Sequence, residues 1–296
     1  MKRNIFVIGM PKNGTTSLSE WLDCYSEISV SSVKEPHYFL PKDNKHRSVK
    51  SKVEYDNTFN EECETRVDCS TLYCFYESTI EAISKLSNSK VVFIIREPLA
   101  FIKSHYAQQY STFDEVEDNF NKAWDRSEPP KNEYCRDELL VSYKEVLNYK
   151  NIIENINRHF NPDSRLFIYY EDLINHQEDT LLKILSFIDI KNINENDFKL
   201  PFSNKMKRKP QLSRYLHTLN KENVFYKMFS TFNKNIFKGV FRISYIENVL
   251  SKYGKERVVE PLSLENEKEL YEIMNKQYDY IIRQFGDLPD NWKPRN

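Results

Sequence analysis

A loop that combines glycine, lysine and hydroxyl side chains follows the first apolar run of the chain. Segment 9–17 reads Gly-Met-Pro-Lys-Asn-Gly-Thr-Thr-Ser. Lys12 supplies a cation, Thr15 and Thr16 supply hydroxyl donors, and Gly14 allows the backbone to approach a ligand closely. A helix that starts here exposes unpaired N–H groups and the positive end of its dipole. The segment therefore predicts a binding site for a phosphate or sulfate group.

The two glycines of this loop have the spacing of the nucleotide-binding P-loop, but the lysine is displaced. Thr15 follows Gly14 where the P-loop has lysine, and Lys12 stands two positions before that glycine. An ATP-hydrolysing site also needs an acidic residue that holds Mg²⁺ at a strand end, whereas the strongest apolar run ends in Arg96. These departures disfavour an ordinary ATPase or kinase, and a P-loop kinase-like nucleotide-binding protein stays as an alternative. A helix start capped by Thr or Ser, with a solvated Lys12, is the structural alternative.

A second cationic position lies at the exit of that apolar run. Segment 91–98 places the guanidinium of Arg96 directly after the predicted strand, and Ser104 follows two helical turns later. Arginine makes bidentate contacts with phosphate, and serine adds a hydroxyl donor. The pair predicts a second anion site. The alternative is a surface arrangement of Arg96 with Glu97 and an ordinary helix serine.

Segment 34–39, Lys-Glu-Pro-His-Tyr-Phe, is the richest in groups that transfer protons. A carboxylate such as Glu35 accepts a proton from a hydroxyl when its surroundings tune its pKa. His37 is the rival base, because an unperturbed histidine titrates near neutral pH. A structural turn in which Glu35 pairs with Lys34 or another cation is the non-catalytic alternative.

Apolar runs of strand length alternate with helical patterns through the first two thirds of the chain. Strands are expected at 4–9, 29–33, 66–70, 90–95 and 165–170, and helices at 15–25, 77–86, 97–110, 139–160 and 181–188. The alternation predicts an α/β fold of the P-loop type, with three layers and a central, mainly parallel sheet. From about residue 192 helical segments dominate, so a helical C-terminal part is expected. With no repeat and no clean linker, residues 1–296 are expected to form a single domain.

Composition narrows the class of protein. The 296 residues include 43 Lys and Arg and 44 Asp and Glu, a net charge of −1 that argues against a nucleic-acid binder. No stretch approaches the roughly 20 apolar residues of a membrane span, and a secretory signal is not expected. Five cysteines without paired metal-site spacing indicate free thiols in a reduced cytoplasmic protein and no metal centre.

Together these segments resemble the sulfotransferases that use 3'-phosphoadenosine 5'-phosphosulfate (PAPS). Segment 9–17 resembles their 5'-phosphosulfate loop, and the Arg96 and Ser104 pair resembles their 3'-phosphate site. The resemblance continues at 68–73, although the family often has proline at the position of Thr71. It also includes 169–173, 185–190 and 261–263, of which the last resembles bacterial members that act on carbohydrates. Most of the chain is covered, except 41–65 and 111–135.

The resemblance implies in-line transfer of a sulfuryl group from PAPS to an acceptor hydroxyl, without a metal. Lys12 would stabilise the leaving phosphate. Glu35 maps onto the catalytic glutamate of heparan-type sulfotransferases and is favoured as the base over His37. The residues expected to contact PAPS are Lys12, Asn13, Gly14, Thr15, Thr16, Ser17, Arg96, Ser104, Arg208 and Lys209. The last two belong to a basic stretch that fits a solvated run of charges equally well.

The acceptor is less constrained by the sequence. The resemblance to carbohydrate-acting members favours a saccharide, with a small alcohol, phenol or lipid hydroxyl as the alternative. A non-catalytic protein that binds a nucleotide or a sulfated glycan is a further alternative. Residues 41–65 are expected to form a mobile surface excursion, and with 111–131 they are expected to carry acceptor specificity.

Overall fold

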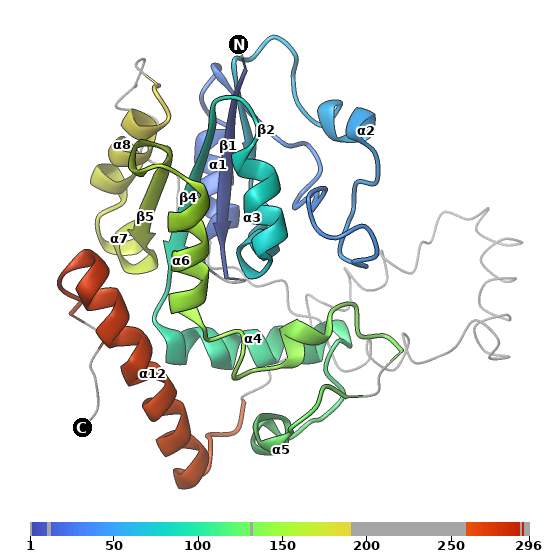
Figure 1. Cartoon of the computed structure of the whole chain (residues 1–296), viewed down its shortest axis with the longest axis vertical. Coiled ribbons are helices and arrows are strands. Elements are labelled where there is room, and N and C mark those ends of the chain that lie inside the picture. The colour runs from blue at the N-terminus through green and yellow to red at the C-terminus, as the bar shows by residue number, and fades with distance from the viewer. Residues whose placement is uncertain (1, 11–12, 131–132, 191–258, 291, 293–296) are drawn as a thin grey trace, which may run out of the picture.

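The computed structural model describes residues 2–10, 13–130, 133–190, 259–290 and 292. Within them, five strands form one sheet in the order β2-β3-β1-β4-β5, and every neighbouring pair is parallel. The strands are β1 (Arg3–Gly9), β2 (Ile28–Val30), β3 (Thr65–Asp68), β4 (Ser89–Ile95) and β5 (Arg165–Tyr169). Helices cover both faces of this sheet (Figure 1). The predicted α/β fold with a central parallel sheet is confirmed.

The apolar strands β1 and β4 divide their side chains between two cores, because successive residues of a strand point to opposite faces. Phe6 and Ile8 belong to one core, while Ile5 and Val7 belong to the other. The first core is covered by α3 (Glu77–Ser84), α4 (Pro98–Thr112), α6 (Tyr149–His159) and α12 (Leu264–Phe285). The second is covered by α1 (Thr15–Leu22), α7 (Tyr170–Asn175) and α8 (Gln177–Phe187). Helix α12 agrees with the expected helical C-terminal part, of which residues 192–258 lie outside the described ranges.

The single helix expected at 139–160 is instead two elements. A short 3-10 helix, η2 (Glu138–Val141), is separated by a turn from α6, which begins only at Tyr149. The break arises because Asn148 caps α6, its side-chain oxygen accepting a hydrogen bond from the Asn151 amide at 3.1 Å. Val146 and Leu147 are buried within the turn, so the apolar pattern continues where the helix does not.

The segment 41–65 lies mostly at the surface, as expected of a surface excursion, but it also carries a helix and a few buried residues that the sequence did not predict. It contains α2 (Lys52–Asp56), whose start carries a capping box of Ser51 and Glu54. Val49, Tyr55 and Phe59 are buried in a small cluster of their own. Its sequence lacks periodicity because one helical turn and three separated apolar residues are too few to produce one.

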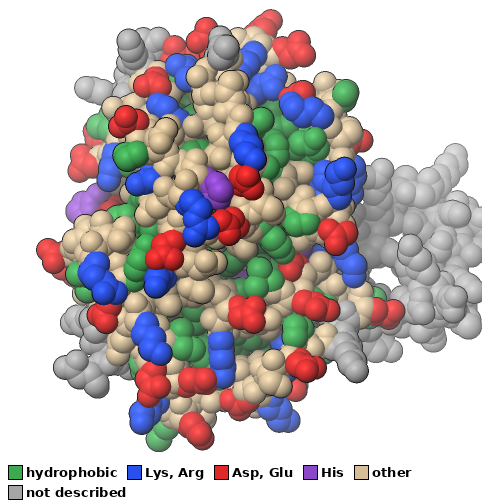
Figure 2. All heavy atoms as spheres, in the orientation of Figure 1, with side chains coloured by type: hydrophobic (Ala, Val, Ile, Leu, Met, Phe, Trp, Pro, Cys, Tyr) green, Lys and Arg blue, Asp and Glu red, His purple; other side chains and the backbone are tan. Residues whose placement is uncertain are grey.

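The remaining described elements are short: η1 (Thr71–Phe75), α5 (Phe120–Asp125) and η3 (Pro162–Ser164). On the face of the molecule shown in Figure 2, acidic and basic side chains are interspersed, in keeping with the balanced composition. In the described part of the chain, no helix has the length and apolarity needed to cross a membrane.

Candidate functional site

The segments singled out by the sequence meet at one edge of the sheet. In the register of β1 with β4, Gly9 lies beside Ile94, so the loop after β1 starts next to Arg96 at the exit of β4. The carboxyl ends of β2 and β3 lead into segment 31–35 and into Ser70 at the same edge. Ligands of open α/β sheets bind at this edge, outside the carboxyl ends of the strands.

The loop after β1 is held against β4 by Asn13. Its side-chain Nδ2 donates to the Ile94 carbonyl at 2.6 Å, and the residue is fully buried. A Cβ atom at Gly9 would lie 3.0 Å from that same carbonyl oxygen, so close approach of the two strands requires glycine there. Asn13, expected to contact PAPS, therefore has an anchoring contact in the structure.

The start of α1 presents backbone donors. Gly14 has φ 79°, in the left-handed region, and turns the chain into the helix. Within the described ranges no side chain caps this helix, so the N–H groups of its first turn stay available to an anion. Thr15 and Ser17 are buried and Thr16 is exposed. Lys12 lies outside the described residues.

Arg96 has the position expected of a second anion-binding group. Its guanidinium carbon lies 4.7 Å from the ring centroid of Tyr170, a cation–π arrangement that restrains the side chain. Glu97 caps α4, because its carboxylate accepts hydrogen bonds from the backbone amides of Leu99 and Ala100. The same carboxylate accepts a hydrogen bond from a tyrosine hydroxyl of α12. Ser104 is half-buried two turns into α4. Arg208 and Lys209 lie outside the described residues.

Glu35 and the start of α1 line one hollow of about 190 Å³, together with neighbouring residues of α1, segment 30–34 and Cys69. The Glu35 side chain is 32% exposed, whereas that of His37 is 5% exposed. The Glu35 Oε2 atom lies 3.5 Å from the Thr71 hydroxyl and 3.8 Å from His37 Nε2. Of the two rival bases, only Glu35 lines this hollow.

The environment of His37 keeps its ring neutral. Burial, followed by the charges of His46 and Arg136, lowers the pKa of His37 to about 3, against the effect of a hydrogen bond with the His46 backbone. A buried ring with so low a pKa carries no charge with which to form an ion pair with Glu35. It is poorly placed to contact a substrate.

The turn that carries both residues is strained and is clamped from outside. Glu35 and His37 each have φ 50°, which non-glycine residues seldom adopt and which concentrates at functional sites. The His37 amide donates to the Ser70 hydroxyl at 2.9 Å, and the Phe39 amide donates to the Tyr73 hydroxyl at 3.2 Å. The Asp-Cys-Ser-Thr-Leu-Tyr segment at 68–73 therefore positions the turn.

Asp68, at the end of β3, completes this clamp, and the sequence analysis assigned it no role. Its Oδ2 atom accepts from the hydroxyls of Tyr55 at 3.0 Å and Tyr73 at 3.1 Å. The residue is 1% exposed, and burial raises the pKa of its carboxyl to about 6. The available signal was an aspartate in the middle of the strand predicted at 66–70. Its partner Tyr55 comes from α2 and could not have been paired with it from the sequence.

Replacing Asp68 by Asn is expected to stabilise the protein above pH 6. The folded-state pKa of about 6 exceeds the ordinary value of 3.8, so the native state binds more protons and the free energy of unfolding falls as pH rises through 4–6. Asp68→Asn retains an oxygen acceptor without that charge. At pH 8 it should raise the free energy of unfolding by up to about 3 kcal/mol, with little gain at pH 4. Urea unfolding at both pH values measures this, and a loss of stability at pH 8 would contradict it.

Segment 41–50 contacts residues that follow the second stretch expected to carry acceptor specificity, 111–131. The Asn44 side chain donates to Asp137 at 3.0 Å, and Lys45 donates to the Cys135 carbonyl at 3.1 Å. The His46 ring centroid lies 6.3 Å from that of His37. Residues 44–46 and 135–137 therefore lie together next to the turn that carries Glu35, and Asp114, inside 111–131, accepts from the Arg136 side chain.

Other titratable groups serve structure. His105, next to Ser104, is fully buried, stacks on Phe101 at 5.1 Å and has Nε2 2.6 Å from the Leu140 carbonyl oxygen. Burial lowers the pKa of His105 to about 4. Among the side chains that the structure describes, no group of three or more His, Cys, Asp or Glu is arranged to hold a metal ion.

Three solved structures are among those to which the chain is similar, and the first of them supports the fold. A sulfotransferase from Alicyclobacillus acidocaldarius is 19% identical with a TM-score of 0.57, covering 74% of this chain and 91% of that one. Mouse sulfotransferase SULT7A1, complexed with PAP, is 15% identical with a TM-score of 0.46, covering 96% and 85%. The sulfotransferase domain of the Synechococcus PCC 7002 olefin synthase is 13% identical with a TM-score of 0.47, covering 98% of both.

The sequence comparisons identify the family. No curated protein sequence matches the chain significantly. The family model of the sulfotransferase domain matches residues 2–238, which is well over half of the chain and includes all five strands of the sheet. The chain therefore belongs to the sulfotransferase family.

Proposed function

We propose that this sulfotransferase moves the sulfuryl group of PAPS to a hydroxyl group of a saccharide. The family uses PAPS as its donor. The observation that carries the proposal is the hollow in which a carboxylate, Glu35, lies beside the uncapped start of α1. An acceptor hydroxyl in this hollow would meet a base on one side and an anion-binding helix start on the other.

The described residues fit the two ends of the donor. Gly14 in the left-handed region and the first-turn amides of α1 suit the 5'-phosphosulfate, because this helix lacks a capping side chain among the described residues. Arg96 and Ser104 suit the 3'-phosphate, since a restrained guanidinium binds a phosphate bidentately. Lys12 would stabilise negative charge on the leaving phosphate. When bound, PAPS supplies the sulfuryl group and that leaving phosphate.

In this proposal Glu35 is the general base. Its carboxylate accepts the proton of the acceptor hydroxyl as the oxygen attacks. The Thr71 hydroxyl lies 3.5 Å from the carboxylate on the protein side, and the buried ring of His37 lies 3.8 Å from it. The clamped turn keeps Glu35 in one geometry, which favours reaction because the nucleophile need not search for its base.

The lining of the hollow favours a saccharide over the alternative acceptors. Hydroxyls of Thr15, Thr16, Ser19, Ser31 and Ser32 border it, and such a wall suits the hydroxyls of a sugar. Lipids and phenols bind pockets lined mainly by apolar side chains. A small alcohol would use the same base but fewer of these contacts.

A kinase-like function is less well supported. The acid at the end of β3, next to β1, is Asp68, which is fully buried and bonded to two tyrosine hydroxyls. The acid after β4, Glu97, caps α4. The carboxylates of both acids at the strand ends beside the loop therefore accept hydrogen bonds from the protein. Binding of a nucleotide with Mg²⁺ requires a carboxylate at such a strand end to hold the metal.

The proposed reaction is tested by transfer of radiolabelled sulfate from PAPS to a panel of acceptors. We expect labelled oligosaccharide and little labelled phenol, fatty alcohol or short-chain alcohol. Labelling of a phenol or lipid alone would replace the saccharide with that acceptor class. Absence of label on every acceptor, with PAPS bound, would favour the non-catalytic alternative.

We also propose a cytoplasmic location. All five cysteines are free, as expected where glutathione keeps thiols reduced. Recovery of the protein in a periplasmic, secreted or membrane fraction of its host cells would contradict this location.

A further inference from the structure

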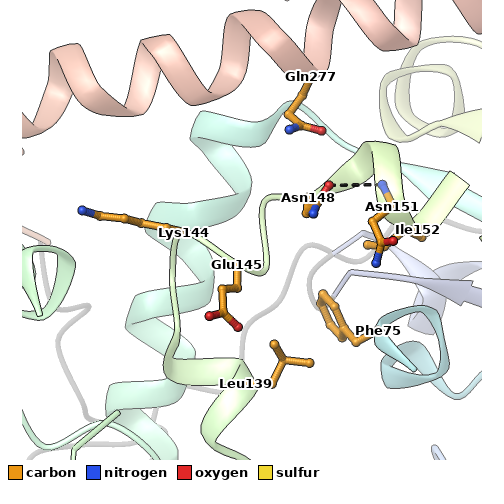
Figure 3. Close-up of a pocket in the computed structure, with 8 residues that line it drawn as sticks. All are labelled: Phe75, Leu139, Lys144, Glu145, Asn148, Asn151, Ile152 and Gln277. Carbon is orange, nitrogen blue, oxygen red and sulfur yellow. Dashed lines mark hydrogen bonds between the residues drawn. The ribbon is translucent and has the colours of Figure 1, made fainter. Parts of the chain in front are cut away.

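A second and larger pocket lies apart from the hollow at Glu35. It measures about 500 Å³, within the usual range of about 300–1,000 Å³ for small-ligand sites. Its walls come from η1, η2 and the turn after it, the start of α6 and the middle of α12 (Figure 3). It shares no lining residue with the hollow at Glu35.

Two side-chain amides in this pocket have a fixed orientation. The Asn148 oxygen accepts from the Asn151 amide at 3.1 Å, and the Gln277 oxygen accepts from the Lys150 amide at 3.0 Å. With both oxygens held by the backbone of α6, the NH₂ groups of Asn148 and Gln277 remain as donors, and both residues line the pocket. Glu145 adds a carboxylate to the lining, an acceptor that complements these donors.

The charges in the pocket argue against an anionic occupant. The two amides already satisfy N–H groups of the first turn of α6, so this helix start has fewer donors for a phosphate. The Lys144 ammonium donates to Glu269 at 2.7 Å and points away from the other labelled side chains (Figure 3). The carboxylate of Glu145 would repel an anion.

The apolar part of the lining completes the recognition chemistry. Phe75, half-buried in η1, presents a ring, and Leu139 lies next to it. Oriented donors, one acceptor and an aromatic ring match the hydroxyls and the C–H face of a neutral sugar. We propose that this pocket binds one neutral sugar residue of the acceptor chain, remote from the residue that is sulfated.

The proposal rests on the saccharide acceptor proposed above and adds a second contact point for it. Helix η1 links the two sites, since Thr71 at its start contacts Glu35 and Phe75 at its end lines the pocket. At about 2 Å rise per residue, the two ends of η1 are about 8 Å apart along its axis. Since the two sites share no lining residue, only an acceptor longer than one sugar residue would contact both.

The test measures sugar binding without PAPS, so that it is independent of sulfuryl transfer. Saturation-transfer NMR of maltose, cellobiose and diacetylchitobiose, with the full chain, is expected to show transfer to ring protons of at least one disaccharide. Phe75→Leu keeps the apolar volume but removes the ring, and Glu145→Gln removes the acceptor charge. Each should weaken binding about fivefold or more.

The control is Glu154→Gln, which changes an exposed charge on α6 outside the pocket and should leave binding within a factor of about two. Circular dichroism of each variant verifies that it is folded. The proposal is overturned if none of the three disaccharides gives transfer, if inorganic phosphate binds at this pocket instead, or if Phe75→Leu and Glu145→Gln bind like wild type. Sugar binding with no sulfuryl transfer would leave this pocket assigned and remove only the proposed reaction.

Discussion

Replacement of Glu35 by Gln is expected to lower the rate of sulfuryl transfer by about 10²–10⁴-fold, the usual contribution of a positioned general base. The amide has the same shape as the carboxylate but cannot accept the proton of the acceptor hydroxyl. Affinity for 3'-phosphoadenosine 5'-phosphate (PAP) should stay within about twofold, because the first-turn amides of α1 and Arg96 are unchanged. Initial rates with saturating PAPS, together with calorimetric PAP titration, separate these two quantities.

The matched control for this experiment is Glu81→Gln on α3, an exposed carboxylate that forms an ion pair with Lys85. It should retain the wild-type rate. A Glu35→Gln enzyme as active as wild type would reject Glu35 as the base. If His37→Asn alone abolished transfer, with Glu35→Gln active, the roles assigned to these two residues would be reversed.

Replacement of Arg96 by Ala is expected to weaken PAP binding by about 30–150-fold. Hydrogen bonds to charged groups contribute about 1.5–3 kcal/mol, and a bidentate guanidinium–phosphate pair lies at the upper end. Arg96→Lys should recover only part of the loss, because lysine keeps the charge but lacks the planar fork. Isothermal titration of each variant with PAP gives the dissociation constants directly.

Arg158→Ala provides the control for Arg96. Arg158 lies on α6, is largely exposed and pairs with Glu77, so its loss should leave PAP affinity unchanged. If both substitutions weakened PAP binding equally, the loss of affinity would come from the long-range electrostatic effect of removing a positive charge. In that case Arg96 would have no specific contact with the nucleotide.

The sequence was sufficient to predict the local parts of this fold. The continuous apolar run at 90–95 predicted a buried central strand, and the structure has it as β4. Gly14 and the hydroxyl residues after it predicted a helix start, which is where α1 begins. Such features depend on short-range periodicity and on the backbone preferences of single residues. Both can be read from a short stretch of sequence.

What the sequence could not predict depends on contacts between distant segments. Asp68 joins Tyr55 and Tyr73, from two elements whose approach is set only by the tertiary fold. The same holds for the contacts of Asn44 with Asp137 and of Lys45 with the Cys135 carbonyl. The break before α6 was missed because buried Val146 and Leu147 continue an apolar pattern through a turn. Side-chain capping by Asn148 then decides where the helix starts.

The central claim, a donor site for PAPS at the carboxyl edge of the sheet, is tested most directly by titrating the full chain with PAP beside ATP and Mg²⁺. We predict saturable binding of PAP without a metal, and at least tenfold weaker binding of ATP with Mg²⁺, because ATP lacks the 3'-phosphate assigned to Arg96. Binding of ATP with Mg²⁺ but not of PAP, or binding of neither, would contradict the account.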